Sequence, residues 1–280
     1  MRFTKMEGIG NDYIYINGFE EKVLNASELS IKMSRCHFGC GSDGLIMILP
    51  SQVADFRMQM FNNDGSESEM CGNGIRCVAK YCYDRGLTEK TEFTIESGGG
   101  IKVMTVHVGE DGTVETVRVD MGQAELDGLL IPSRIEGNPV VMHELMVEDH
   151  VYPVTLVNVG NPHAVTFVDD VKAARVTTDG PKIECHAAFP KKINAEFVHV
   201  IDRGHIEMRV WERGTGETLA CGTGACASAV ASMLNGFCDR KVEVSLIGGK
   251  LGIEWNEDDN HIYMTGAATF VYDGVWLQDM

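Results

Sequence analysis

The chain alternates apolar and polar residues with a period of two over many short segments. TEFTIES, KVMTVHV and ETVRVDM, which begin at Thr91, Lys102 and Glu115, follow this pattern. Successive side chains of a strand point to opposite faces, so the pattern predicts half-exposed antiparallel strands. The more apolar stretches YIYIN and AVTFV, which begin at Tyr13 and Ala164, also predict strands.

Three other segments predict helices. One spans Ala26 to Arg35, with Ser27 as its N-cap and Glu28 in its first turn. The other two each follow a Cys-Gly-x-Gly turn, within EMCGNGIRC and LACGTGACA.

The two helices after these turns differ in charge. The later one, from Cys221 to Cys238, has no charged residue and is rich in Ala and Ser. It offers no face to solvent, so we expect a sheet to enclose it. The earlier helix, after Cys71, carries Arg76, Lys80, Asp84 and Arg85, and we expect it to be less enclosed at its far end.

The sequence matches itself when it is shifted by 150 positions. The matches are Gly10-Asn11 with Gly160-Asn161, Glu67 with Glu217, Cys71-Gly72 with Cys221-Gly222, Gly74 with Gly224, Gly86 with Gly236, and Gly98-Gly99 with Gly248-Gly249. The strand residues Phe56, Met58 and Met60 also fall on Ile206, Met208 and Val210. Gly86 and Gly236 are placed to end the two helices. A match of this length without an insertion predicts that one module has been duplicated.

The duplication and the length of 280 residues predict two domains. We expect an α+β fold of two pseudo-symmetric modules, each a mainly antiparallel sheet wrapped around a central helix, with the active site in the cleft between them. The expected boundaries are 1–121 for the first module and 122–266 for the second, with 267–280 returning to the first.

Charge and composition narrow the class of protein. The formal charge of -17 would repel a phosphate backbone, which argues against nucleic acid and anionic membranes as partners. No segment reads as a signal peptide or a membrane span, so we expect a soluble cytoplasmic protein. The 9 cysteines lack the spacing of a disulfide framework, which is typical of a reducing compartment.

The paired Cys-Gly-x-Gly turns carry the candidate chemistry. A cysteine at the start of a helix sits at the positive end of the helix dipole, which lowers the pKa of a thiol from about 8.5. The neighbouring glycines let backbone N–H groups approach a carboxylate. Two such sites facing each other predict an inversion reaction, in which one thiolate removes a proton from a carbon and the opposite thiol returns a proton to the other face.

Five motifs occur along the chain: GIGNDY, FNNDGSESEMCGNGIRC, NVGNPH, KKINAEF and WERGTGETLACGTGAC. In these motifs the chain resembles the diaminopimelate epimerase family, and this resemblance covers almost the whole chain. It implies interconversion of LL- and meso-diaminopimelate in lysine and peptidoglycan precursor biosynthesis, without pyridoxal phosphate, another cofactor or a metal. The small molecule diaminopimelate is then the partner, and the family resemblance implies a homodimer.

The resemblance also implies roles for individual residues. Cys221 resembles the acceptor of the proton of the LL-substrate and Cys71 the donor, and His163 and Glu212 resemble residues that tune the thiols. The residues that resemble the substrate-binding set are Asn11, Asn62, Gly72, Asn73, Asn161, Asn194, Glu212, Arg213, Gly222 and Thr223. Some family members have Gln where this chain has Gly44, so a side-chain contact is lost there.

Other interpretations stay open at this point. A related cofactor-independent proline racemase or phenazine-type isomerase would have the same two-module design, although Asn73 stands where proline racemases resemble one another in having His. A thiol switch that joins Cys71 to Cys221 is a non-enzymatic alternative. Cys36, His37 and Cys40 lack a second pair of zinc ligands, so packing explains them better than a metal site. Cys77, Cys82, Cys226 and Cys238 are interpreted as structural thiols.

Overall fold

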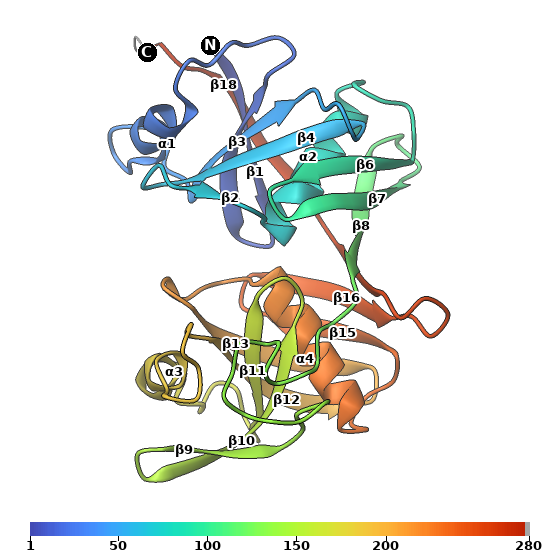
Figure 1. Ribbon diagram of the computed structural model, residues 1–280. Helices are drawn as coiled ribbons and strands as arrows, with labels where there is room; N and C mark the ends of the chain where they lie inside the picture. Colours follow the sequence, from blue (N-terminus) through green and yellow to red (C-terminus); the bar gives the residue numbers. More distant parts are fainter. Residues whose placement is uncertain (278–280) are drawn as a thin grey trace. The chain divides into compact units, whose positions relative to one another are not determined.

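The computed structural model describes residues 1–277, which fold into two compact units (Figure 1). Unit 1 comprises Met1–Asp120 together with the chain from Thr265 onward, and unit 2 comprises Met121–Met264. Residues 278–280, the end of the segment expected to return to the first module, lie outside the described part.

Unit 1 is a sheet with two helices. Its elements are β1 (Arg2–Gly8), β2 (Asn11–Asn17), α1 (Ala26–Ser34), β3 (Gly44–Leu49), β4 (Phe56–Asn62), β5 (Glu67–Ser68), α2 (Gly72–Asp84), β6 (Glu92–Ser97), β7 (Gly100–Val108), β8 (Val114–Gly122), which runs on into unit 2, and β18 (Thr269–Val275). The last strand, red in Figure 1, pairs antiparallel with β1, and the backbone N–H of Trp276 donates to the carbonyl oxygen of Met1. Unit 1 is therefore closed by strands from both ends of the chain.

Unit 2 repeats this arrangement. Its elements are β9 (His143–Val147), β10 (His150–Asn158), β11 (Pro162–Phe167), α3 (Val176–Glu184), β12 (Asn194–Asp202), β13 (His205–Glu212), β14 (Gly216–Glu217), α4 (Gly222–Leu234), β15 (Lys241–Leu246), β16 (Gly249–Trp255) and β17 (Ile262–Gly266). Helices α3 and α4 begin and end 150 positions after α1 and α2. The parallel pair β2–β3 recurs as β11–β12, and the antiparallel pair β3–β4 recurs as β12–β13. The predicted duplicated α+β fold is confirmed.

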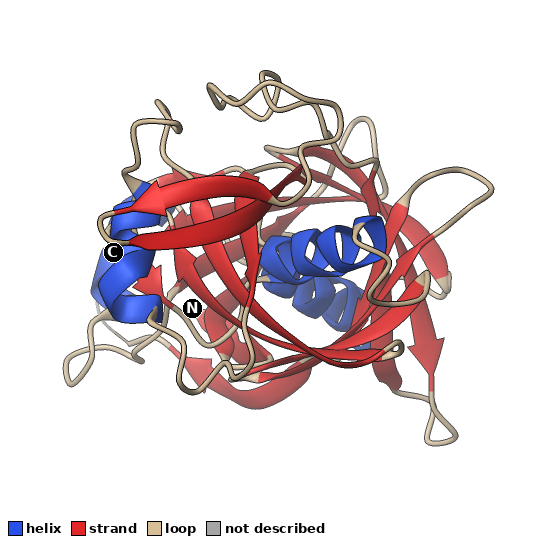
Figure 2. Ribbon diagram, turned by 90° about the horizontal axis from the view of Figure 1, so that it is seen from below, coloured by secondary structure: helices blue, strands red, loops and turns tan. Residues whose placement is uncertain are grey.

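A sheet encloses the long helix of each unit. Helix α4 packs against β10 to β13 and against β15 and β16, and α2 packs against β1, β2 and β7. Figure 2 shows strands curving around the long helices. Gly86 and Gly236 follow the ends of α2 and α4 with φ of 70° and 71°, as predicted for helix stops. Within residues 1–277, no helix combines the length and the apolar character that crossing a membrane needs.

Two charged residues in the middle of α2 are more enclosed than the sequence indicates. Arg76 is fully buried, and its guanidinium donates to the carbonyl oxygens of Gly72 and Ala267. Lys80 is also buried and forms an ion pair with Asp84 at 2.8 Å. The far end of the helix is less enclosed, as expected, since Asp84 is half-buried and Arg85 is exposed. The burial of Arg76 and Lys80 was not expected, and hydrogen bonds and an ion pair compensate their charges.

The predicted N-cap of α1 is also wrong. Asn25, two residues earlier, accepts the backbone N–H of Glu28 with its side-chain oxygen. The hydroxyl of Ser27 instead donates to the carbonyl oxygen of Gly65, in a turn distant in sequence. Asn and Ser are equally good caps, and only the tertiary contact of Ser27 distinguishes them.

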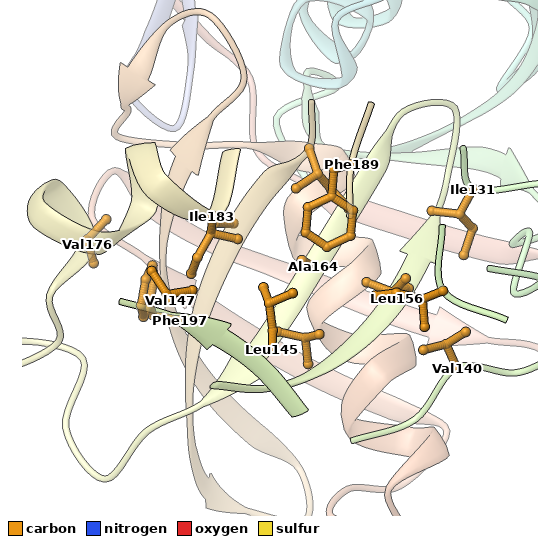
Figure 3. Close-up of a cluster of buried hydrophobic side chains, with 14 residues drawn as sticks. Ile131, Val140, Leu145, Val147, Leu156, Ala164, Val176, Ile183, Phe189 and Phe197 are labelled. Atoms are coloured by element: carbon orange, nitrogen blue, oxygen red, sulfur yellow. The ribbon is translucent and has the colours of Figure 1, made fainter. Parts of the chain in front are cut away.

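Helix α3 covers one face of the unit 2 sheet. Val176 and Ile183 on the helix lie with Leu145, Leu156 and Phe197 on the strands in one buried apolar cluster (Figure 3). Burial of these side chains holds α3 on the sheet. The helix also passes close to the next strand of the sheet, since a Cβ on its only glycine would lie 2.6 Å from the Trp211 side chain.

Candidate active site

The thiol of Cys71 stands at the N-terminus of α2. It is the N-cap residue, and its sulfur accepts the backbone N–H of Gly74 at 3.3 Å. The thiol also donates to Oδ1 of Asn11 at 3.1 Å. Unit 1 therefore brings two of the predicted site residues together, although 60 positions separate them in the sequence.

Asp43 sets the orientation of the Asn11 amide. Its Oδ2 accepts the side-chain N–H of Asn11 at 2.7 Å and the backbone N–H of Asp12 at 3.1 Å. Burial raises the pKa of the Asp43 carboxyl, in opposition to these hydrogen bonds. Because the amide nitrogen of Asn11 is held by the carboxylate, its oxygen is the end that faces Cys71.

The thiol of Cys221 has the same position at the N-terminus of α4. Its sulfur accepts the backbone N–H of Gly224 at 3.3 Å and lies 3.5 Å from the hydroxyl oxygen of Thr223. Burial raises the pKa of the Cys221 thiol well above its usual value, and the negative charges of Glu212 and Glu196 raise it further. The expectation that a helix N-terminus lowers this pKa is therefore wrong for Cys221, because burial and two carboxylates outweigh the dipole.

His163 lies in a buried hydrogen-bonded chain in unit 2. Its Nδ1 is 2.6 Å from Oε1 of Glu196, and its Nε2 is 2.8 Å from Oδ1 of Asn161. His163 and Glu196 are both fully buried. The sequence prediction placed His163 and Asn161 in the site but missed Glu196, which occurs in the KKINAEF motif on β12.

Glu212 is the last residue of β13, and Arg213 begins the loop that follows it. The backbone N–H of Arg213 donates to Oδ1 of Asn194 at 2.8 Å, and the side-chain N–H of Asn194 donates to the carbonyl oxygen of Pro162 at 2.8 Å. The hydroxyl of Thr218 donates to the carboxylate of Glu212. These bonds tie the loop to β11 and β12, the strands that carry the His163 chain.

A buried carboxylate that the sequence prediction missed also holds this loop in place. Glu184, at the end of α3, accepts the indole N–H of Trp211 at 2.8 Å and the backbone N–H of Gly214 at 3.1 Å. Lys192 pairs with the same carboxylate at 2.9 Å. The loop is therefore fixed on both sides of Glu212 and Arg213.

The remaining predicted residues of unit 1 lie at the end of β4 and at the start of α2. The Asn62 side chain donates to the Ser66 hydroxyl at 3.0 Å, and the backbone N–H of Gly65 donates to the Asn62 carbonyl oxygen, so this segment is a turn. Gly72 and Asn73 form the first turn of α2, as Gly222 and Thr223 do in α4, so their backbone N–H groups lie at the positive ends of the two helix dipoles. At Gly44 a Cβ would lie 2.1 Å from the Phe61 carbonyl oxygen, so no side chain fits there.

The chain matches one protein family over most of its length. The family model for diaminopimelate epimerase matches residues 3–126 and 155–271. The diaminopimelate epimerase of Acetivibrio thermocellus is 56% identical over 274 residues, which are 98% of this chain and 98% of the relative. That of Methanococcus maripaludis is 54% identical over 274 residues, which are 98% of this chain and 99% of the relative. The chain belongs to the diaminopimelate epimerase family. It is therefore an isomerase by family.

Solved structures of more distant proteins share the fold of this diaminopimelate epimerase family member. A phenazine biosynthesis protein of the PhzF family from Bacillus anthracis superposes with a TM-score of 0.69 at 18% identity, over 99% of each chain. A hydroxyproline epimerase from Agrobacterium vitis superposes with a TM-score of 0.68 at 14% identity, over 98% of this chain and 90% of the other. At these identities the likeness establishes the duplicated fold only.

The other cysteines of this diaminopimelate epimerase family member differ from the two N-cap thiols. Cys77, Cys82, Cys226 and Cys238 are buried, and burial raises the pKa of Cys77 to about 12 and that of Cys238 to about 11. Cys36 and Cys185 are exposed. Among residues 1–277, no three His, Cys, Asp or Glu side chains gather in a set that could hold a metal ion.

Proposed function

We propose that this chain interconverts LL- and meso-diaminopimelate, with Cys71 and Cys221 as the two acid/base groups. The observation that carries the proposal is the repeated cap. In each unit a cysteine sulfur accepts the backbone N–H of the glycine three residues later, at 3.3 Å in both cases. Membership of the diaminopimelate epimerase family supports the substrate.

The first turns of α2 and α4 suit the carboxylate beside the reacting carbon. Removal of the α-proton leaves a carbanion whose negative charge spreads onto that carboxylate. Backbone N–H groups at Gly72, Asn73, Gly222 and Thr223, at the positive ends of two helix dipoles, would stabilise this charge as it develops. The proposal requires the two thiols to reach opposite faces of one α-carbon.

The loop after β13 suits the far end of the substrate, which carries one ammonium and one carboxylate. A guanidinium binds a carboxylate with two parallel hydrogen bonds, so we assign the far carboxylate to Arg213 and the ammonium to Glu212. Asn62, Asn161 and Asn194 would complete the set of polar contacts.

The raised pKa of Cys221 bears on the direction of the reaction. Turnover of the meso-substrate needs a thiolate at Cys71, which accepts the α-proton, and a thiol at Cys221, which donates one to the carbanion. Burial raises the pKa of Cys221 and so favours the thiol there. Turnover of the LL-substrate starts from the other form, with a thiolate at Cys221 and a thiol at Cys71. The enzyme therefore alternates between two protonation forms.

The proposal is tested by incubation of the reduced protein with LL-diaminopimelate in deuterated water, without an added cofactor. NMR follows the α-proton, and chiral chromatography follows the stereoisomers. We expect meso product with deuterium at the inverted carbon, formed about 10²- to 10⁴-fold more slowly by Cys71→Ala and by Cys221→Ala. Folded, reduced wild-type protein that neither exchanges the proton nor forms product would refute the proposed substrate.

We further propose a place for this reaction in lysine and peptidoglycan precursor biosynthesis, in the cytoplasm, with a homodimer as the active form. The support is the family to which the chain belongs. Loss of growth without added diaminopimelate or lysine in a strain that lacks the gene tests the pathway, and sedimentation of the purified protein tests the homodimer.

A further inference from the structure

The buried pair His163 and Glu196 has no counterpart in unit 1. At the shift of 150 positions, Tyr13 matches His163 and Ile46 matches Glu196. Ile46 and Glu196 occupy equivalent positions in the two units. A Cβ on Gly74 would lie 2.7 Å from Cδ1 of Ile46, and a Cβ on Gly224 would lie 3.1 Å from Oε1 of Glu196. Unit 2 therefore has a carboxyl group where the same fold in unit 1 has an aliphatic side chain.

Stability does not explain this carboxyl group. Glu196 is fully buried, burial raises its pKa, and its Oε2 has no hydrogen-bond partner within residues 1–277. Burial of an incompletely paired carboxyl group costs stability, whereas Ile46 occupies the equivalent place in unit 1 at no such cost. A functional role accounts for Glu196 better than a packing role.

The proton positions in the chain follow from its burial. If His163 donated from Nδ1 to an ionised Glu196 and accepted at Nε2, the buried pair would carry a full negative charge. One further proton makes the pair neutral, either on the imidazole or on Glu196, and Nε2 then donates to Oδ1 of Asn161. The neutral arrangement is the one with Asn161 Oδ1 facing the imidazole.

The equivalent asparagines of the two units therefore present opposite ends of their side-chain amides. Asn11 is held by its nitrogen, on Asp43, and presents its oxygen to Cys71. Asn161 is held by its oxygen, on His163, which leaves its NH₂ group as the end available to a ligand. A carbonyl oxygen receives an ammonium or a thiol, and an NH₂ group receives a carboxylate.

We propose that Glu196 is a positioning residue that acts through His163 to turn the NH₂ group of Asn161 toward a substrate carboxylate. It sets the polarity of this contact without touching the substrate. This inference rests on the proposed function, because the carboxylate is that of diaminopimelate.

Three variants test the kinetic consequence. Glu196→Ile copies the residue of unit 1 and removes the group that holds the proton on Nε2. We expect its KM for diaminopimelate to rise roughly 10- to 100-fold, as for a lost hydrogen bond to a charged group, with kcat changed less. Glu196→Gln donates an amide N–H to Nδ1, keeps the proton on Nε2 and rescues most of the affinity. Thr166→Val, a buried change on β11 whose hydroxyl has no hydrogen-bond partner within residues 1–277, leaves KM unchanged.

Nitrogen-15 NMR of the ligand-free protein tests the proton positions directly, with the His163 signals assigned by comparison with His163→Gln. We expect a proton on Nε2 in the wild type and in Glu196→Gln, and a mixture of tautomers in Glu196→Ile. An unprotonated Nε2 in the wild type, or an unchanged KM in folded Glu196→Ile, would overturn the inference. If Glu196→Ile does not fold, the NMR spectra of the wild type and Glu196→Gln decide. Failure of the wild type to epimerise diaminopimelate refutes the proposed function instead and leaves the NMR result to stand alone.

Discussion

Replacing each N-cap cysteine by serine or by alanine should distinguish the contribution of the side chain to stability from its contribution to catalysis. A serine hydroxyl at position 71 or 221 still accepts the N–H of Gly74 or Gly224, whereas alanine leaves that N–H without its cap. Loss of a capping side chain to alanine costs about 1 kcal/mol. For units of this size we expect the alanine variants to melt about 2–8 °C below the serine variants.

Both replacements should have the same effect on the reaction. An alcohol is far too weak an acid to exchange a proton with an α-carbon at neutral pH, so serine is no better than alanine as an acid/base group. Loss of either group should lower kcat by about 10²- to 10⁴-fold. Urea denaturation gives the free energy of unfolding, and deuterium incorporation into diaminopimelate gives the rate.

Cys82 provides the matched control. It is fully buried inside α2 and does not cap the helix. At position 82 serine would place a hydroxyl among apolar groups. We therefore expect the reverse order of stability, with Cys82→Ala more stable than Cys82→Ser. Both variants should retain activity. If the alanine variants at positions 71 and 221 are as stable as the serine variants, the sulfur atoms do not cap their helices and the reasoning fails.

Four further predictions concern pH, backbone space and buried charge. Because burial raises the pKa of Cys221, its alkylation by iodoacetamide should be slow at pH 7 and accelerate above the usual thiol range, as peptide mass spectrometry can measure. The same shift contributes stability that is present below about pH 8.5 and is lost as pH rises through the folded-state pKa, and a Cys221→Ser variant should lack this loss in urea titrations at different pH. Gly44→Gln should destabilise unit 1 by about 1–3 kcal/mol or more, since its Cβ would lie 2.1 Å from the Phe61 carbonyl oxygen; an equal urea midpoint would contradict this. Asp84→Asn should cost about 3–5 kcal/mol because it leaves the buried ammonium of Lys80 uncompensated, and the double variant with Lys80→Met should cost less than Asp84→Asn alone.

The sequence predicts the duplicated fold well because the repeated features are local. The Cys-Gly-x-Gly turns, the glycines that end α2 and α4, and the alternating strands each depend on a few neighbouring residues. Helix α3 was not predicted, since Gly180 and Pro181 within it disfavour a helix. It forms because its apolar side chains are buried on the sheet of unit 2.

The candidate site was predicted only in part, for a related reason. Cys71 and Cys221 stand in a repeated motif, whereas Asp43 and Glu196 lie 28 and 25 positions away from them and act through contacts made by folding. The high pKa of Cys221 likewise comes from burial and from carboxylates on other strands, which a local helix dipole does not reveal. One signal was present for Glu196: it is a charged residue in a strand where the repeat has Ile46.

The pairing of β18 with β1 has a consequence for how the chain is made. A ribosome releases nearly all of the chain before Thr269–Val275 emerge, so β1 has no partner on that edge during most of synthesis. Unit 2 is continuous in sequence and can fold as soon as its residues are out, as domains generally do. The half of the duplication that is translated first is therefore completed last, and a stop codon before Thr269 would remove the partner strand of β1.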